Sequence, residues 1–149
     1  MAVERDNPNG GFNFLVNLGA AQTTPAAAGF AEVFGLGMAV DVVEYRNGND
    51  KVNATRKLPG LTRTPQVRLC RGIVGDLSLF DWLQSVAKGS QDYRDITIEL
   101  LSEDQSQTVF TWSLTQAIPV SYSTPSLAAG KSALAIEELV LACQSIAVS

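Results

Sequence analysis

Apolar residues recur at every second position in several short runs of this chain, and this pattern constrains its fold most. The runs lie at residues 12–18, 66–73, 96–100 and 110–114, with polar or turn-forming residues between them. Alternation of this kind is typical of a strand with one buried face. The polar residues 102–107 are expected to join the last two runs as a hairpin connection. The pattern therefore predicts a chain built mainly of β-strands.

A long apolar stretch from Phe30 to Arg46 is interrupted by Gly35 and Gly37. Glycine inside a strand pattern marks a bend or a bulge, so we expect either two strands or one bent strand. Between residues 40 and 45 the alternation is imperfect, as though both faces of this strand met protein. The residues before it, 19–29, are rich in Ala, Thr and Pro and are expected to form a loop.

One segment, residues 76–88, has the spacing of an amphipathic helix. Asp76 is the expected N-cap, and Gly89 is expected to follow the last turn. The apolar side chains that fit helical spacing are Leu79, Leu83 and Val86, with Phe80 and Trp82 at the flanks. About three turns of helix are not stable alone, so this face needs a sheet to cover it.

The last apolar run, residues 132–146, is ambiguous. It contains good helix formers, but its apolar residues also alternate if the phase slips by one residue near Glu137 and Glu138, as at a bulge. Periodicity leaves helix and strand open here. The preceding segment, bracketed by Pro119 and Pro125, is expected to be irregular.

The chain of 149 residues suits one domain, residues 1–149, with polar and flexible residues 1–11 at its start. No apolar run approaches the roughly 18 residues of a membrane span, so we expect no membrane insertion of the monomer. The first residues lack the charged and apolar regions of a secretory signal. We therefore expect synthesis in the cytoplasm without Sec-type export.

The composition argues against catalysis, because the chain has no histidine. Histidine is the commonest general base and the commonest metal ligand. Cys70 and Cys143 lack metal-type spacing and are expected to be free and apolar in character. The adjacent pairs Glu103-Asp104 and Glu137-Glu138 do not form catalytic carboxylate pairs by themselves, because neighbours on a strand face opposite ways. We expect no enzyme, no catalytic residue, no cofactor and no bound metal.

Basic residues are concentrated between Lys51 and Arg71, where no acidic residue occurs. Residues 1–75 carry 8 Lys and Arg against 6 Asp and Glu, and residues 76–149 carry 3 against 9, giving +2 and −6. A copy that docks one face onto a different face of the next copy gains orientation from such polarity. A solvated loop and nucleic-acid binding are the alternatives, although no aromatic residue for base stacking lies in this block.

Six motifs in this order are similar to the contractile-phage tail tube family, including the inner tube proteins of phage-tail-like contractile injection systems. The resemblance covers nearly the whole chain, although the C-terminal residues Cys143-Gln144-Ser145 depart from the family pattern. The motifs are Phe12-Asn-Phe-Leu-Val, Tyr45-Arg-Asn-Gly leading to Arg56-Lys-Leu-Pro-Gly-Leu61, Arg68-Leu-Cys-Arg-Gly72, Leu79-Phe-Asp-Trp-Leu83, Trp112-Ser-Leu with Ala117-Ile-Pro-Val120, and Ala135-Ile-Glu-Glu-Leu139.

The resemblance implies a small β-sandwich or barrel-like domain with one α-helix, in which the last apolar run is a strand. It implies homo-hexameric rings that stack into a tube inside a contractile sheath, with baseplate and tube-terminator proteins as further partners and DNA or effector protein as cargo. Such a tube belongs to a virion tail or a phage-tail-like particle. Residues 47–64 match the family's extended inter-subunit loop or hairpin, with an interface at Lys51, Arg56, Lys57, Leu58, Pro59, Leu61 and Arg63.

In this interpretation the six basic residues of the block meet acidic groups of an adjacent copy. They are Lys51, Arg56, Lys57, Arg63, Arg68 and Arg71. The alternative function is a ring-forming carrier or adaptor of secreted effectors, similar to the type VI secretion tube protein. Isolated rings that bind cargo without stacking would distinguish the carrier from the tube.

Overall fold

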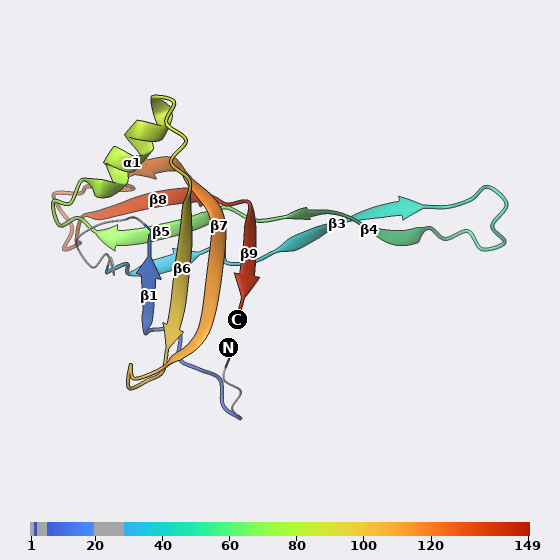
Figure 1. Cartoon of the computed structure of the whole chain (residues 1–149), viewed down its shortest axis with the longest axis horizontal. Coiled ribbons are helices and arrows are strands. Elements are labelled where there is room, and N and C mark those ends of the chain that lie inside the picture. Colours follow the sequence, from blue (N-terminus) through green and yellow to red (C-terminus); the bar gives the residue numbers. More distant parts are fainter. Residues whose placement is uncertain (1, 3–5, 20–28) are drawn as a thin grey trace.

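A computed structural model, which describes residues 2, 6–19 and 29–149, shows two sheets, one helix and a long projecting hairpin (Figure 1). The hydrogen-bonded strands follow the order β1-β6-β7-β8-β5-β2. Strand β7 is long enough to belong to both sheets, and β9 pairs with the first half of β7. The elements are β1 Phe14–Asn17, β2 Glu32–Phe34, β3 Ala39–Tyr45, β4 Arg56–Arg63, β5 Val67–Gly72, α1 Ser78–Ala87, β6 Arg94–Leu101, β7 Thr108–Ser123, β8 Ile136–Ala142 and β9 Ser145–Val148. The mainly β fold with one helix is the predicted class.

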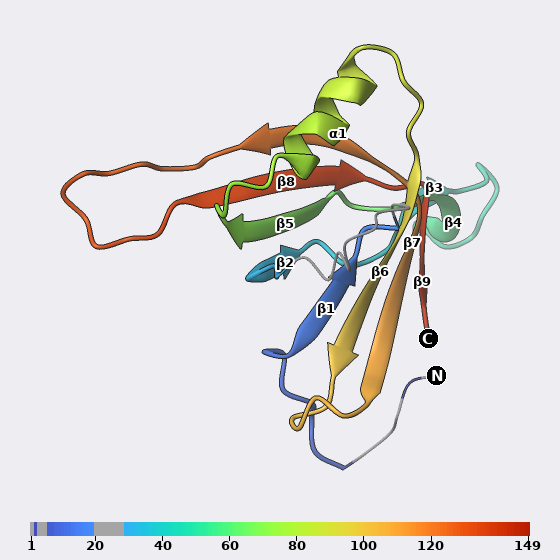
Figure 2. The same ribbon diagram turned by 60° about the vertical axis from the view of Figure 1, so that its left-hand side comes forward.

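Strand β7 turns a corner between the two sheets (Figure 2). Its first part pairs with β6 and β9, and the part from Ile118 onward pairs with β8. At the corner Gln116 has a positive φ of 53°, and its N–H donates a 3.0 Å hydrogen bond to Oδ1 of Asp95. The prediction of an irregular segment between Pro119 and Pro125 is wrong for its first part, because β7 continues to Ser123. A register shift between Pro119 and Ser121 lets the strand continue past the proline.

The core lies between the two sheets and beneath the helix. Alternate residues of β6 and β7 face it from one sheet, and alternate residues of β5 and β8 face it from the other. The sequence pattern predicted this alternation for β5, β6 and β7. The most buried apolar side chains include Val16, Val67, Leu69, Ile96, Ile98, Leu114, Leu139 and Leu141. Burying a Leu, Ile or Val side chain contributes about 1.5–3 kcal/mol, so these alternating positions hold the sheets together.

Helix α1 covers one end of the core and packs against β7. The predicted N-cap is wrong: the helix begins at Ser78 with Leu77 at the N-cap, while Asp76 Oδ1 accepts the Ser78 N–H in a turn just before it. The predicted position of Gly89 is confirmed by its φ of +100° after the C-cap Lys88. Trp82 is not at a flank but in the core, where its Nε1 donates to the Asp92 carbonyl at 2.9 Å.

The ambiguous C-terminal run is strand and not helix, as the family resemblance implied, but it is divided into two strands, β8 and β9. The proposed phase slip is wrong, because β8 alternates without interruption and its buried positions are Glu137, Leu139 and Leu141. A glutamate therefore occupies a core-facing position. Its charge requires a partner, which lies on β5.

The apolar stretch 30–46 forms two strands, β2 and β3, as one of the two alternatives predicted. Gly35 ends β2 with a φ of +85°, and a Cβ at this position would lie 2.2 Å from the Gln66 carbonyl oxygen. Only glycine fits so close to backbone in this conformation. The loop expected over residues 19–29 falls largely outside the described residues.

Candidate assembly surface

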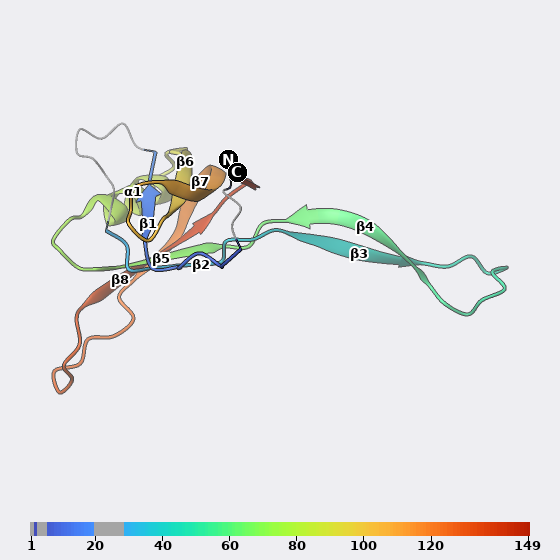
Figure 3. The same ribbon diagram turned by 90° about the horizontal axis from the view of Figure 1, so that it is seen from below.

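The β3–β4 hairpin projects far from the rest of the chain (Figures 1 and 3). None of the residues of β3 or β4 is buried, and only Asp41 is half-buried. Several large apolar side chains are nonetheless present, with Val42 61% and Leu61 79% exposed. A two-stranded ribbon in water is marginally stable by itself. The hairpin is therefore a candidate docking element that a partner covers.

Both faces of the hairpin are apolar, as the imperfect alternation in the sequence suggested. The pairing of Val43 with Leu58 and of Tyr45 with Arg56 places Val43, Tyr45 and Leu58 on one face. Val42 pairs with Pro59, and Val40 with Thr62, on the opposite face. A surface loop that met only solvent on one side would have no reason to carry apolar residues on both faces.

A set of polar contacts holds the tip of the hairpin, residues 46–55, in shape. The Arg46 guanidinium donates to the carbonyls of Val52 at 3.2 Å and Asp50 at 3.1 Å, and to Oδ1 of Asn53 at 3.0 Å. Asp50 Oδ2 accepts the Asn47 N–H at 3.0 Å. The tip is thus organised before any partner arrives, which lowers the entropy lost on docking.

The structure places all seven predicted interface residues on this hairpin. Lys51 lies in the tip, and Arg56, Lys57, Leu58, Pro59, Leu61 and Arg63 lie on β4. The segment 47–64 is thus half tip and half strand. The dipeptide Pro59-Gly60 lies within β4, at the register shift between Val40 and Val42 of β3. Their contact with another copy remains a prediction.

The basic residues have more partners within the chain than the charge pattern suggested. Arg56 pairs with Asp50 at 3.3 Å, Arg63 with Asp41 at 2.9 Å, and Arg68 with Glu138 at 3.0 Å. Arg71 is buried and pairs with Glu137. The expectation that all six meet an adjacent copy is therefore wrong for Arg71. Lys51 and Lys57 alone of the six make no ion pair within the described part of the chain.

The buried pair joins three strands and the start of the helix. Arg71 donates from Nε to Glu137 Oε1 and lies over the Phe30 ring, with its guanidinium carbon 5.7 Å from the ring centre. Tyr122 donates its hydroxyl to Glu137 Oε2, and this hydrogen bond to the carboxylate raises the pKa of the phenol above its usual value. Arg71 also contacts Asp76, whose pKa is lowered mainly by the Ser78 N–H. Of the adjacent pair Glu137-Glu138, only Glu137 belongs to this structural cluster, whereas Glu138 lies on the opposite face of β8 and pairs with Arg68.

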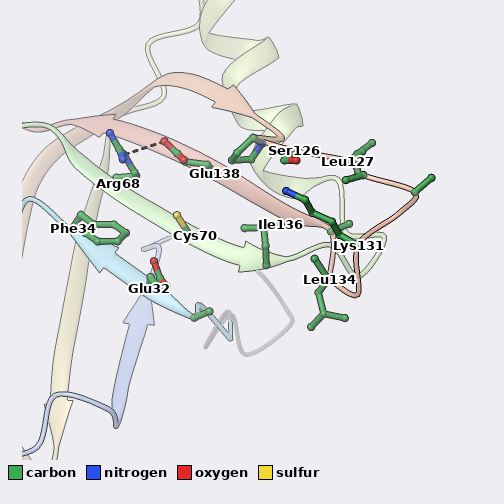
Figure 4. Close-up of a pocket in the computed structure, with 16 residues that line it drawn as sticks. Glu32, Phe34, Arg68, Cys70, Ser126, Leu127, Lys131, Leu134, Ile136 and Glu138 are labelled. Atoms are coloured by element: carbon green, nitrogen blue, oxygen red, sulfur yellow. Dashed lines mark ion pairs between the residues drawn. The ribbon is translucent and has the colours of Figure 1, made fainter.

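Two pockets lie beside the edge strand β2. The larger, of about 840 Å³, lies on the outer face of β2, β5 and β8 beneath the loop that follows β7, as Figure 4 shows. A second, of about 460 Å³, lies between β2 and the inner face of β1, β6 and β7.

The described residues contain no group of three His, Cys, Asp or Glu side chains that could hold a metal ion. Cys70 and Cys143 are both free, and burial raises the pKa of both thiols.

Solved structures similar to this one come from contractile injection systems. A chain of the sheath-tube complex of an extracellular contractile injection system, PVC, in its extended state is 28% identical, with a TM-score of 0.82 over 97% of this chain and 93% of that one. A chain of the anti-feeding prophage baseplate, 6-fold symmetrised, is 27% identical, with a TM-score of 0.84 over 97% of both. Hcp1 from Flavobacterium johnsoniae shares the fold at 14% identity, with a TM-score of 0.55 over 91% of this chain and 94% of that one. No curated protein matches the chain.

The fold, the two-faced hairpin and these similarities define a structural tube protein of contractile tails and contractile injection systems. The family model described as the T4-like virus tail tube protein gp19 matches residues 10–147, and the chain belongs to that family. The predicted family is thereby confirmed. No helix among the described residues is long and apolar enough to cross a membrane.

Sequence reasoning missed two sets of residues in this surface. Arg46 and Asp50 organise the tip, but nothing in their spacing distinguishes them from solvated turn residues. Val42 and Val43 were noticed only as imperfect alternation. Two adjacent valines in a predicted strand were the available indication of a ribbon exposed on both faces.

Proposed function

We propose that this chain is the repeating subunit of an inner tube, in which six copies form a ring and rings stack through the β3–β4 hairpin. The observation that carries the proposal is the hairpin itself, which presents apolar side chains on two faces and has no cover within the described chain. Docking against sibling subunits buries these side chains, and burial contributes about 25 cal/mol per Å² of apolar surface.

Six copies per ring is the number that the family resemblance implies, and the 6-fold symmetry of the similar baseplate structure supports it. The open strand edges add a second reason for ring closure. Within the described residues β1, β2 and β9 each pair with one strand only, and unpaired edges are sites of pairing with another chain. A closed ring removes such edges.

The partners of the proposed tube are a contractile sheath, a baseplate and a tube terminator, and its cargo is DNA or an effector protein. Similarity to chains from a sheath-tube complex and from a baseplate supports the first two. The subunit acts as a passive conduit without chemistry of its own, while the sheath supplies the force. Assembly takes place in the cytoplasm, and the finished particle can be released from the cell.

Electron microscopy of the purified protein over a range of concentrations tests this proposal. We expect rings that stack into tubes, either spontaneously or on addition of the cognate baseplate as nucleator. Rings that bind cargo but never stack would favour an effector carrier. Monomers at high concentration, both alone and with the nucleator, would refute the proposed tube.

A further inference from the structure

The sheet formed by β1, β6, β7 and β9 has one face that the rest of the described chain leaves open. Ile96, Ile98 and Leu114 point from the other face into the core. None of the side chains on the open face is buried, and strand pairing places them in rows. One row is Asn17, Thr97, Ser113 and Ala147, the next is Leu15, Glu99, Thr111 and Ser149, and Asp95, Thr115 and Ser145 lie beyond the first.

The open face carries acidic charge and no basic charge. Most of its side chains are short and end in a hydroxyl or an amide, and its charged members are Asp95 and Glu99. Arg94 is the one basic residue of the four strands, and it lies away from this face, paired with Asp92 and 4.3 Å from the centre of the Trp82 ring. Such a face suits contact with water, because the buried centre of a subunit interface is depleted in charged residues.

The edges of this sheet indicate where the open face lies in a ring. Strands β1 and β9 are its two free edges, and Figure 2 shows them on either side of β6 and β7. A ring that closes through these edges turns the sheet into a wall with an inner and an outer side. The second sheet and helix α1 cover the core side, and the wider circumference outside the wall accommodates them. The open face is then the inner side.

The acidic residues of such a wall act together on whatever passes through it. Each copy contributes Asp95 and Glu99, and no basic side chain of the four strands offsets them. A concave surface of one charge sign focuses the field, because its walls have a low dielectric constant. DNA carries one negative charge for about every 1.7 Å of its axis, so this wall repels it. A polypeptide rich in Lys and Arg is attracted instead.

We propose that the open face of β1, β6, β7 and β9 is the wall of the conduit and that its cargo is a polypeptide of net positive charge. The inference rests on the proposed function and deepens it, since it chooses protein over DNA. It assigns the electrostatic contact with cargo to Asp95 and Glu99, while the short hydroxyl side chains between them leave the cargo free to slide.

Thiol labelling tests the position of the wall. Thr115→Cys, exposed on the open face, is made in a Cys70→Ala, Cys143→Ser background and assembled into tubes. We expect N-ethylmaleimide to modify this thiol in tubes, and a maleimide carried on streptavidin to modify at least tenfold less of it than in dissociated subunits. The matched control is Lys88→Cys at the exposed end of α1, which both reagents should modify in tubes.

Two results of this labelling would overturn the inference. Modification of Thr115→Cys by both reagents would place the face on the outside of the tube. Modification by neither reagent would place it in a contact between subunits.

A retention assay tests the class of cargo. Tubes are assembled with fluorescent peptides of equal length, one rich in Lys and one rich in Glu, or with a single-stranded oligonucleotide, and are then pelleted. We expect at least tenfold more of the Lys-rich peptide than of either anionic probe in the pellet, with the difference shrinking as salt is added. Equal or greater retention of the oligonucleotide would overturn the inference and favour a DNA conduit.

Variants locate the charge that is responsible. Glu99→Gln should reduce retention of the Lys-rich peptide at least threefold, and Thr97→Lys, two residues from an intact Glu99, should reduce it further. Two variants are made so that loss of assembly in one leaves the test to the other. Asp81→Asn removes an exposed carboxylate from the helix and should leave retention unchanged. Equal losses from Glu99→Gln and Asp81→Asn would contradict the role of Glu99.

These outcomes separate the two proposals. If wild-type protein forms tubes that retain the oligonucleotide as well as the Lys-rich peptide, the cargo assignment is wrong and the tube function stands. If wild-type protein never assembles, alone or with a nucleator, the tube function fails and the conduit wall fails with it.

Discussion

Arg71 and Glu137 lie directly opposite each other on β5 and β8 and form an ion pair in the core, with exposed fractions of 5% and 2%. Tyr122 from β7 and Asp76 from the start of the helical segment complete their hydrogen bonding. The described residues contain no buried side-chain nitrogen or oxygen without a partner. The cluster thus joins the sheet behind the outer pocket to the helix.

Removing the acidic partner should destabilise the monomer. Glu137→Leu leaves the Arg71 guanidinium buried without its carboxylate, which costs about 3–5 kcal/mol. The double variant Arg71→Met, Glu137→Leu should recover much of this loss, because no charge then remains buried. Urea denaturation of the monomer measures both, and a loss below about 1 kcal/mol for Glu137→Leu would contradict the assigned role.

A charged residue on the hairpin should block assembly without affecting the fold. Val42→Asp changes an exposed side chain, so the free energy of unfolding of the monomer should change by at most about 0.5 kcal/mol. Tubes should be absent from electron micrographs, because the docked state would bury an unpaired carboxylate. Val74→Asp is the matched control, since Val74 is also exposed but lies outside the hairpin. Equal assembly of the two variants would disprove the role of Val42.

A methyl group added at Gly35, between β2 and the β3–β4 hairpin, should destabilise the fold. Gly35→Ala puts a Cβ 2.2 Å from the Gln66 carbonyl oxygen at a φ of +85°, so the backbone must shift. We expect a loss of about 1–3 kcal/mol in stability and fewer tubes. Gly37→Ala, two residues further on, meets nothing within 4 Å and should be nearly neutral. The comparison is made by thermal unfolding and pelleting, and similar values for the two variants would contradict the prediction.

The turn between β6 and β7 should respond to acid. Hydrogen bonds from the Ser102 hydroxyl and from the hydroxyl and N–H of Ser106 lower the pKa of Asp104 to about 2. Because the folded pKa lies below the unfolded value of about 3.9, Asp104 stabilises the fold above pH 4, and this contribution is lost as the pH falls toward 2. Asp104→Asn should flatten the decline of stability over this range. A carboxyl resonance titrating near pH 4 by NMR would rule the explanation out.

The strands were predictable because alternation is a local signal. Glu137 was not predictable as a core residue, because its partner Arg71 is 66 positions away and only the strand register brings the two together. The continuation of β7 past Pro119 depends in the same way on a register shift that pairing with β8 creates.

The sequence predicted where the candidate surface lies in the chain, but only part of its secondary structure and ion pairing. The basic residues and the family resemblance placed a functional segment at 47–64, but β4 contains Pro59 and Gly60, which are poor strand formers. It is a strand because it pairs with β3. Charge counting likewise overlooked that Arg56 and Arg63 have acidic partners on the same hairpin, since Asp50 and Asp41 lie outside the basic block.

The central claim is that the two-faced hairpin is exposed in the monomer and covered in the tube. Amide hydrogen exchange of residues 39–63, measured in dilute monomer and in assembled tubes, tests it most directly. We predict that these amides exchange at least tenfold more slowly in the tube, while amides in the middle of β5 and β8 change little. Equal exchange of the hairpin in the two states would contradict the account.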